Sequence, residues 1–285
     1  MTKSLKIRIL DFIKLIPLYY IVGNKNIILY VLSICLYNIL NSIFDNISIR
    51  DSLQKVYYNY SKNIIFKKTL LITGIMSVIS IIISVIIGSL LSSFLHIEDS
   101  IIVFLFMGFS VYLEYFIKFC LEYLETFNSK KLSRLLFNSY YYIEIIFFLI
   151  AALICFRFMD VSIQLSNAFL YLSKIVSSLI IFIIFYLSIK SKKLEYVKRR
   201  EEIKIDYVLV IKNIFKNVNF SLVIKNLYYY ISVIVLYYIL SVRYNYIIDE
   251  MSLIINFIYF YGISLINIIV DILNMFVNYF NKKDD

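Results

Sequence analysis

The sequence predicts an all-α integral membrane protein with about eight transmembrane helices, arranged as one six-helix lobe plus two further spans. Three observations lead to this class. The 285 residues are 61% hydrophobic and only 17% charged, whereas soluble domains are close to half apolar and a quarter charged. The apolar residues fall into stretches of about 20, the length that crosses roughly 30 Å of hydrocarbon. The basic residues gather in alternate connections between these stretches.

Eight apolar stretches are the candidate spans. They run over 9–22, 27–44, 69–95, 101–124, 135–158, 161–189, 220–242 and 251–280. The first is the shortest, contains Pro17 and follows Lys3, Lys6 and Arg8, a pattern that also resembles a secretory signal. Because the residues after it offer no small-residue cleavage pattern, we expect it to be a retained span. The single Pro also argues against spans with unwound centres.

The positive-inside rule tests this count, because one missed span would invert every later connection. Connections expected on the cytoplasmic or matrix side, 45–68, 125–134 and 190–219, are rich in Lys and Arg. Those expected on the opposite side hold few basic residues and several acidic ones, and one of them contains His96. The alternation predicts that both termini lie on the cytoplasmic or matrix side, in a plasma membrane or an organelle inner membrane.

These features divide the chain into three parts. Residues 1–189 are expected to form a six-span membrane lobe, 190–219 a basic cytoplasmic linker with an amphipathic helix, and 220–285 two further spans. A plain connector is the alternative for the amphipathic helix. The basic linker is expected to contact anionic lipid headgroups, and nucleic acid is not an expected partner despite the net charge of +10.

Ionisable residues inside the spans are the candidate functional residues, since a charge at mid-bilayer costs at least about 2.5–3.5 kcal/mol. Glu114 lies about 20 Å below the start of the fourth span, at 1.5 Å per residue. Lys118 and Glu122 follow it at i+4 and i+8. These two are close enough to the headgroups to snorkel, and Lys118 is also spaced to pair with Glu114.

The fifth and sixth spans form a predicted hairpin about Met159 and Asp160. Glu144 precedes this turn by about as many residues as Lys174 follows it, so the two side chains come level and can pair. A polar layer near mid-depth is therefore predicted to bind substrate through Lys174, Glu144, Glu114, Lys118 and Lys14, with Glu114 and Glu144 also coupling ions. The alternative is that these charges form structural ion pairs between packed helices.

No catalytic site, metal site or cofactor is predicted, and an enzyme is not expected. The sequence has no phosphate-binding Gly loop, no paired-His metal motif and no nucleophile elbow. Cys35, Cys120 and Cys155 all lie inside apolar runs, where free cysteine behaves as a small hydrophobic residue.

Two stretches resemble the MATE-like superfamily of flippases, which export multidrug substrates, lipid-linked oligosaccharides and polysaccharide precursors. Residues 18–57, LYYIVGNKNIILYVLSICLYNILNSIFDNISIRDSLQKVY, look like that family's second span and its basic exit. Asp45 stands where the family has Asp, and Ile47 stands where it usually has Gly. Residues 215–240, FKNVNFSLVIKNLYYYISVIVLYYIL, look like the start of a second lobe.

The resemblance implies alternating access by two lobes about a central cavity. Lys174 would hold the anionic head group of a lipid-linked or amphipathic substrate while the lipid tail stays in the bilayer. Glu114 or Glu144 would balance charge or couple protons or sodium. Such flippases usually have twelve or more spans in two lobes, whereas this chain shows one lobe and two spans.

A lobe of only two spans is expected to leave polar faces exposed to lipid, so a second membrane subunit or a homo-oligomer is an expected partner. The competing function is that of a non-catalytic, membrane-embedded subunit of a larger respiratory or translocation complex, including organelle-encoded ones. In that case the buried charges only fix the pairing of helices.

Overall fold

The protein is described here from a computed structural model, and all its regular structure is helical within the described residues. These are residues 3–22, 27–44, 62–95, 100–127, 130–159, 161–191 and 220–240, together with scattered positions between 250 and 273. The helices are α1 (Lys3–Val22), α2 (Ile28–Phe44), α4 (Lys62–Leu95), α5 (Ser100–Phe127), α6 (Lys130–Leu153), η1 (Ile154–Phe158), α7 (Ile163–Phe169), α8 (Leu172–Ser191) and α10 (Phe220–Tyr238).

Three helical stretches in the described chain are long and apolar enough to cross a membrane: Ser100–Leu121, Lys131–Phe158 and Ile163–Ser188. Two shorter apolar stretches, Ile28–Ile43 and Ser77–Leu91, accompany them. The described part of the chain is therefore all-helical, with three helices long and apolar enough to span a membrane. The full count of eight spans stays a prediction. The expected linker over 192–219 lies outside the described residues, as does much of the expected last span.

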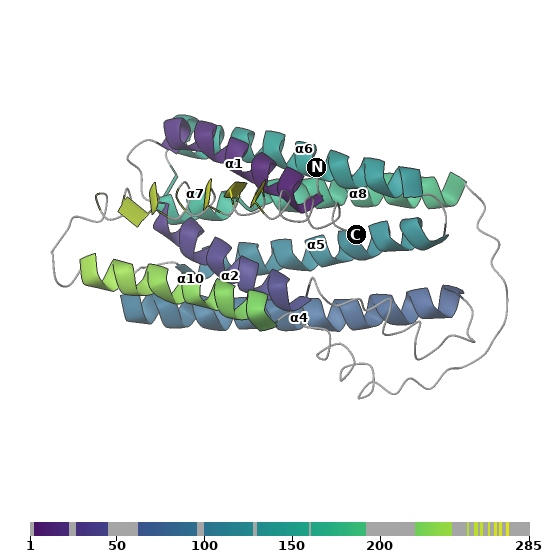
Figure 1. The fold of residues 1–285 in the computed structure, drawn as a ribbon, viewed down its shortest axis with the longest axis horizontal. Helices are drawn as coiled ribbons and strands as arrows, with labels where there is room; N and C mark the ends of the chain where they lie inside the picture. The colour runs from purple at the N-terminus through teal and green to yellow at the C-terminus, as the bar shows by residue number, and fades with distance from the viewer. Residues whose placement is uncertain are drawn as a thin grey trace, which may run out of the picture.

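The long helices lie side by side along one axis, and successive ones run in opposite directions (Figure 1). At one end of the molecule α4 and α6 begin and α5 and α8 finish. Helix α5 is central, because it packs against α2, α4, α6, α7 and α8. Helix α1 lies against α6, and α10 lies against α2. The α10–α2 contact joins the expected third part of the chain, 220–285, to the first, and the division into three parts stays a prediction.

The predicted sixth span contains a short turn that the sequence did not indicate. Leu170 and Tyr171 separate α7 from α8 in a turn without Pro or Gly. Two contacts with α2 hold this turn in place. The Asn167 Oδ1 accepts a hydrogen bond from the Tyr30 backbone N–H at 3.3 Å, and the Tyr171 and Ser33 hydroxyls lie 2.7 Å apart. Asn167 thereby satisfies one of the free N–H groups in the first turn of α2.

Large apolar side chains cover much of the outside of the bundle. On α4 the exposed face carries Ile75, Val78, Ile82, Ile86 and Leu90. A monomeric soluble protein rarely exposes contiguous apolar surface on this scale, whereas lipid covers it without cost. Two cores lie inside. The larger one joins α1, α2, α5, α7 and α10 and includes residues of α4, α6 and η1, and the other joins α5, α6 and α8.

Small residues bring α4 close to α5. Ser80, Ser84 and Gly88 recur every four residues along one face of α4, and Ser80 and Ser84 are fully buried. A Cβ atom added at Gly88 would meet the Phe104 Cβ atom of α5 at 2.7 Å. The Ser100 hydroxyl donates to the Gly88 carbonyl at 2.9 Å. This is the packing by which helices associate in lipid, where burying apolar surface gives little driving force.

Replacing Gly88 with Ala should destabilise the bundle by about 1–3 kcal/mol, because the new methyl group overlaps the Phe104 side chain. Gly74→Ala on the same helix is the matched control, since no atom lies within 4 Å of a Cβ atom there. It should be neutral or stabilising by about 0.5–1 kcal/mol. Thermal unfolding in detergent, followed by a dye that reacts with the buried thiols of Cys120 and Cys155, measures both. Equal behaviour of the two variants would contradict the close α4–α5 packing.

Candidate functional site

Four different helices contribute the predicted charged residues, and the structure brings all five together. Lys14 comes from α1, Glu114 and Lys118 from α5, Glu144 from α6 and Lys174 from α8. Lys14, Glu114, Glu144 and Lys174 are buried, and Lys118 is partly exposed. Each buried group lies on the inward face of its helix, so the charges point into protein rather than toward lipid, as charged groups inside membrane proteins do.

Lys174 is the centre of the group. Its Nζ atom lies 3.5 Å from the Glu144 Oε1 atom and 3.6 Å from the Glu114 Oε2 atom. The same ammonium donates a hydrogen bond to the Tyr37 hydroxyl of α2 at 3.0 Å, and it lies 4.4 Å from the centre of the Tyr37 ring. The pairing that the sequence predicted between Glu144 and Lys174 is therefore present.

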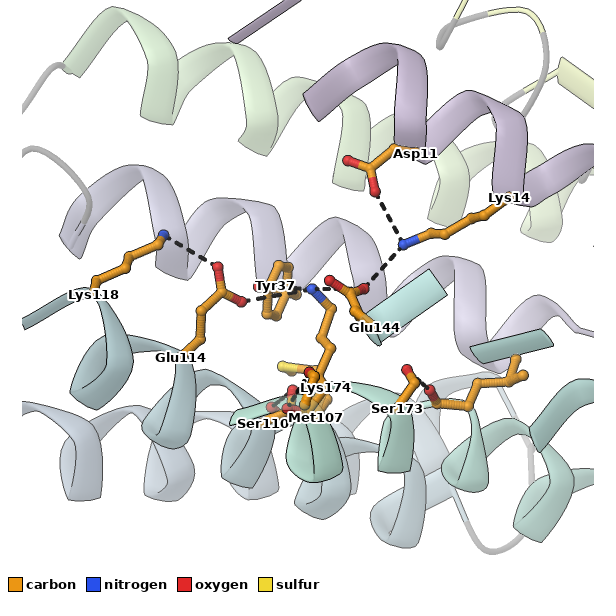
Figure 2. Close-up of polar contacts among 12 residues, drawn as sticks. Asp11, Lys14, Tyr37, Met107, Ser110, Glu114, Lys118, Glu144, Ser173 and Lys174 are labelled. Carbon is orange, nitrogen blue, oxygen red and sulfur yellow. Dashed lines mark hydrogen bonds and ion pairs between the residues drawn. The ribbon is translucent and has the colours of Figure 1, made fainter. Parts of the chain in front are cut away.

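Two arms extend from this centre (Figure 2). In one, the Lys14 Nζ atom lies 3.2 Å from the Glu144 Oε1 atom and 3.0 Å from the Asp11 Oδ1 atom. In the other, the Lys118 Nζ atom lies 3.2 Å from the Glu114 Oε1 atom. The six residues form a continuous series that we call the charge ladder, and its order is Asp11, Lys14, Glu144, Lys174, Glu114 and Lys118.

Signs alternate along the ladder, so its three carboxylates and three ammonium groups sum to zero. Each of the four inner members touches an opposite charge on both sides. This arrangement offsets the large desolvation penalty of taking charges out of water, which an isolated buried charge could not do. The Lys14 ammonium gains further from the Phe148 ring, whose centre lies 5.1 Å away.

Sequence reasoning missed two members of the site. Asp11 was overlooked although it lies three residues before Lys14, a spacing at which opposite charges pair on a helix. Tyr37 carries no sequence signal, because its role depends on how α2 is rotated. The side chain of Glu122 and the whole of Asp45 lie outside the described part of the chain.

The charge ladder keeps ionised groups inside the bundle and allows Lys174 to change its carboxylate partner. This chemistry suits the binding of charged groups rather than covalent catalysis. Lys174 contacts two carboxylates at nearly equal distances, so either one can release it while the other keeps it neutralised. Among the described residues, no group of three or more His, Cys, Asp or Glu side chains is arranged to hold a metal ion. No protein-family model, curated protein or solved structure matches the chain.

Replacing one partner of the central pair should destabilise the protein, and replacing both should restore much of the loss. Lys174→Met or Glu144→Leu alone leaves one unbalanced charge inside the bundle, and we expect a loss of about 3 kcal/mol or more. The double variant keeps the ladder neutral with apolar side chains of similar size, so its stability should lie close to that of the parent protein.

The measurement is thermal unfolding in detergent of the parent, both single variants and the double variant. Lys131→Met is the matched control, because Lys131 is exposed at the start of α6 and exposed charges contribute little to stability. Additive losses in the double variant would show that Glu144 and Lys174 do not interact.

Proposed function

We propose that this chain is a multi-pass transport protein of eight spans that moves a lipid-linked or amphipathic anionic substrate across a membrane. The observation that carries the proposal is the charge ladder, a neutral series of ion pairs across four helices of an apolar bundle, whose four inner members are buried. Ionisable groups in the interior of membrane proteins mark substrate or ion pathways far more often than surface charges do.

The direction of the helices supports the proposed topology. The end of the bundle where α4 and α6 begin and α8 finishes (Figure 1) carries Lys131 and Arg134 of α6, both with exposed side chains. We place this end, and with it both termini, on the cytoplasmic or matrix side. Its lysines and arginines would then lie against anionic lipid headgroups.

Lys174 is the proposed substrate-binding group. An anionic head group that enters the bundle would replace Glu114 or Glu144 as a partner of the Lys174 ammonium, while its lipid tail remains in the bilayer. The remaining carboxylate, with Lys14 or Lys118, would keep the site balanced. Glu114 and Glu144 are the proposed ion-coupling groups, because releasing Lys174 leaves one of them free to take up a cation. Alternating access in the manner of MATE-like flippases is the proposed mode of movement.

A second function is favoured by one observation on α1. The Asp11 side chain is 50% exposed on a helix whose neighbouring Ile13 and Ile16 are also exposed. A half-exposed carboxylate on an apolar face is unfavourable in lipid, and a protein partner covering α1 would remove this penalty. The chain would then be a non-catalytic subunit of a larger respiratory or translocation complex, or one copy of a homo-oligomer.

Lipid transfer in proteoliposomes tests the first function. Phosphatidylglycerol labelled on its acyl chain serves as the anionic probe, and dithionite quenching reports its passage between leaflets. The parent protein should accelerate passage over empty liposomes, Lys174→Met should slow it at least tenfold, and Lys131→Met should leave it within twofold. Transfer that is equally fast in Lys174→Met would contradict a head-group role for Lys174, as would no acceleration by the parent protein.

Migration on a native detergent gel tests the second function. The tagged chain, extracted gently from its own membrane, should run as one defined complex well above the 33.9 kDa of a single copy, if α1 is covered by a partner. Asp11→Asn leaves the neighbouring Lys14 in place and should weaken that complex, whereas Lys131→Met should not. A single-copy band from native membranes would contradict the subunit function.

A further inference from the structure

Four buried polar atoms close to the charge ladder have no hydrogen-bond partner within the described part of the chain. They are the Asn41 Oδ1 atom of α2, the Glu114 Oε2 atom of α5, the Tyr140 hydroxyl of α6 and the Ser178 Oγ atom of α8. Buried polar groups are nearly always paired, and leaving one unpaired typically costs about 1–3 kcal/mol. Among the described residues, the Glu114 Oε2 atom has only its ion pair with the Lys174 ammonium at 3.6 Å, and the other three atoms, from three neighbouring helices, have no hydrogen-bond partner. The four atoms therefore need a common explanation.

Three of these atoms belong to residues four positions from Lys174, from Glu144 or from Tyr37, the hydrogen-bond partner of Lys174. All three lie in the same direction along the bundle. Asn41 follows Tyr37 by four residues on α2, and Ser178 follows Lys174 by four residues on α8. Tyr140 precedes Glu144 by four residues on α6, which runs opposite to α2 and α8 (Figure 1). Each step is about 6 Å toward the end where α4 and α6 begin. The fourth atom, Glu114 Oε2, belongs to the ladder itself.

Three of the four side chains are deeply buried. Glu114 is 5% exposed, Tyr140 3% and Ser178 1%. The Tyr140 hydroxyl is close enough to Glu114, Lys174 and Glu144 to interact with them electrostatically. Apolar side chains close the other side, because Tyr140 packs in one core with Ile117 of α5 and Ile181 of α8.

Ser178 differs from the other serines inside the bundle. Ser80, Ser84, Ser110 and Ser177 each donate to a carbonyl three or four residues earlier in their own helix. This local bond is the usual way in which a helical serine satisfies its hydroxyl. Ser178 makes no such bond, although its neighbour Ser177 does. Its Oγ atom is therefore free to serve another ligand.

We propose that Glu114, Tyr140 and Ser178, with Asn41 beside them, form a binding site for a monovalent inorganic cation. All four atoms are oxygens, one of them carries negative charge, and carboxylate, carbonyl and hydroxyl oxygens are the ligands of hard cations. A monovalent ion suits the site better than a divalent one. The site offers a single carboxylate, and the nearby ammonium groups of Lys174 and Lys118 repel a divalent cation more strongly than a monovalent one. The Lys174 ammonium can turn fully to Glu144 and Tyr37 when the cation occupies the Glu114 Oε2 atom.

This site would supply the cation for the proposed transport, and its link to transport rests on that proposed function. A bound cation makes the neutral ladder positive by one charge, and an anionic head group at Lys174 restores neutrality. The two ligands should therefore strengthen each other's binding, and the coupling must be reciprocal. Cation binding itself is measurable without any transport, so the site and the transport function fail independently.

Thermal unfolding of the purified full-length protein in detergent tests the site. A ligand that binds only the folded state raises the unfolding temperature as it saturates. The protein is titrated with NaCl and with KCl, and choline chloride at equal ionic strength is the reference. We expect a saturable rise with at least one of the two inorganic cations. Tyr140→Phe and Ser178→Ala, which remove only a hydroxyl, should each require at least tenfold more cation for the half-maximal effect.

Two neighbouring variants are the matched controls. Ser177→Ala removes a hydroxyl at the adjacent position of α8, and Tyr142→Phe removes one from an exposed position of α6. Each should titrate like the parent protein. The proposal is overturned if neither NaCl nor KCl stabilises the parent beyond choline chloride, since the four oxygens are then satisfied by water alone. It is equally overturned if the two control variants shift as much as Tyr140→Phe and Ser178→Ala.

Discussion

The ion pairs of Lys174 with Glu114 and Glu144 are the interaction on which the rest of the structure depends. In an apolar interior a charge is tolerated only beside an opposite charge, and these contacts of 3.5 and 3.6 Å require a definite depth and rotation of α5, α6 and α8. Lys14 adds α1 to the same constraint through Glu144. Apolar packing alone is non-directional and lets helices slide or turn. The charge ladder therefore sets the register of the bundle, and small residues and apolar side chains fill in around it.

Most of the described polar groups in the same interior have a partner, and only a few do not. Most buried serines are satisfied by their own helix, the Asn167 side chain caps the start of α2, and the ladder neutralises its own charges. Against this background the oxygens of Tyr140 and Ser178 have no hydrogen-bond partner in the described part of the chain, and the Glu114 Oε2 atom has only its ion pair with the Lys174 ammonium, which also contacts Glu144. The proposed substrate-binding group, Lys174, and the proposed cation site share the Glu114 carboxylate, so they would form a coupled unit. A purely structural set of ion pairs has no need of the unpaired oxygens.

The sequence was sufficient for the class of fold and for the centre of the site. The lengths of the apolar stretches predicted the ends of α2 and α5 to within a few residues. Counting residues from the turn near Met159 predicted that Glu144 and Lys174 lie at the same depth. These predictions rest on helical rise, which is the same for every sequence. The turn at Leu170 and Tyr171 escaped prediction because it is held by tertiary contacts with α2. Tyr37, Tyr140 and Ser178 escaped it because their roles depend on helix rotation, which only the packed bundle defines.

An experimental density map of the protein in a lipid nanodisc tests the central claim most directly. The account predicts density for the Lys174 side chain between the carboxylates of Glu114 and Glu144, within about 4 Å of each, near the middle of the bilayer. It also predicts that α4 and α6 begin at one membrane surface. A map in which Lys174 reaches a headgroup region, or in which Glu144 faces lipid away from α8, would contradict it.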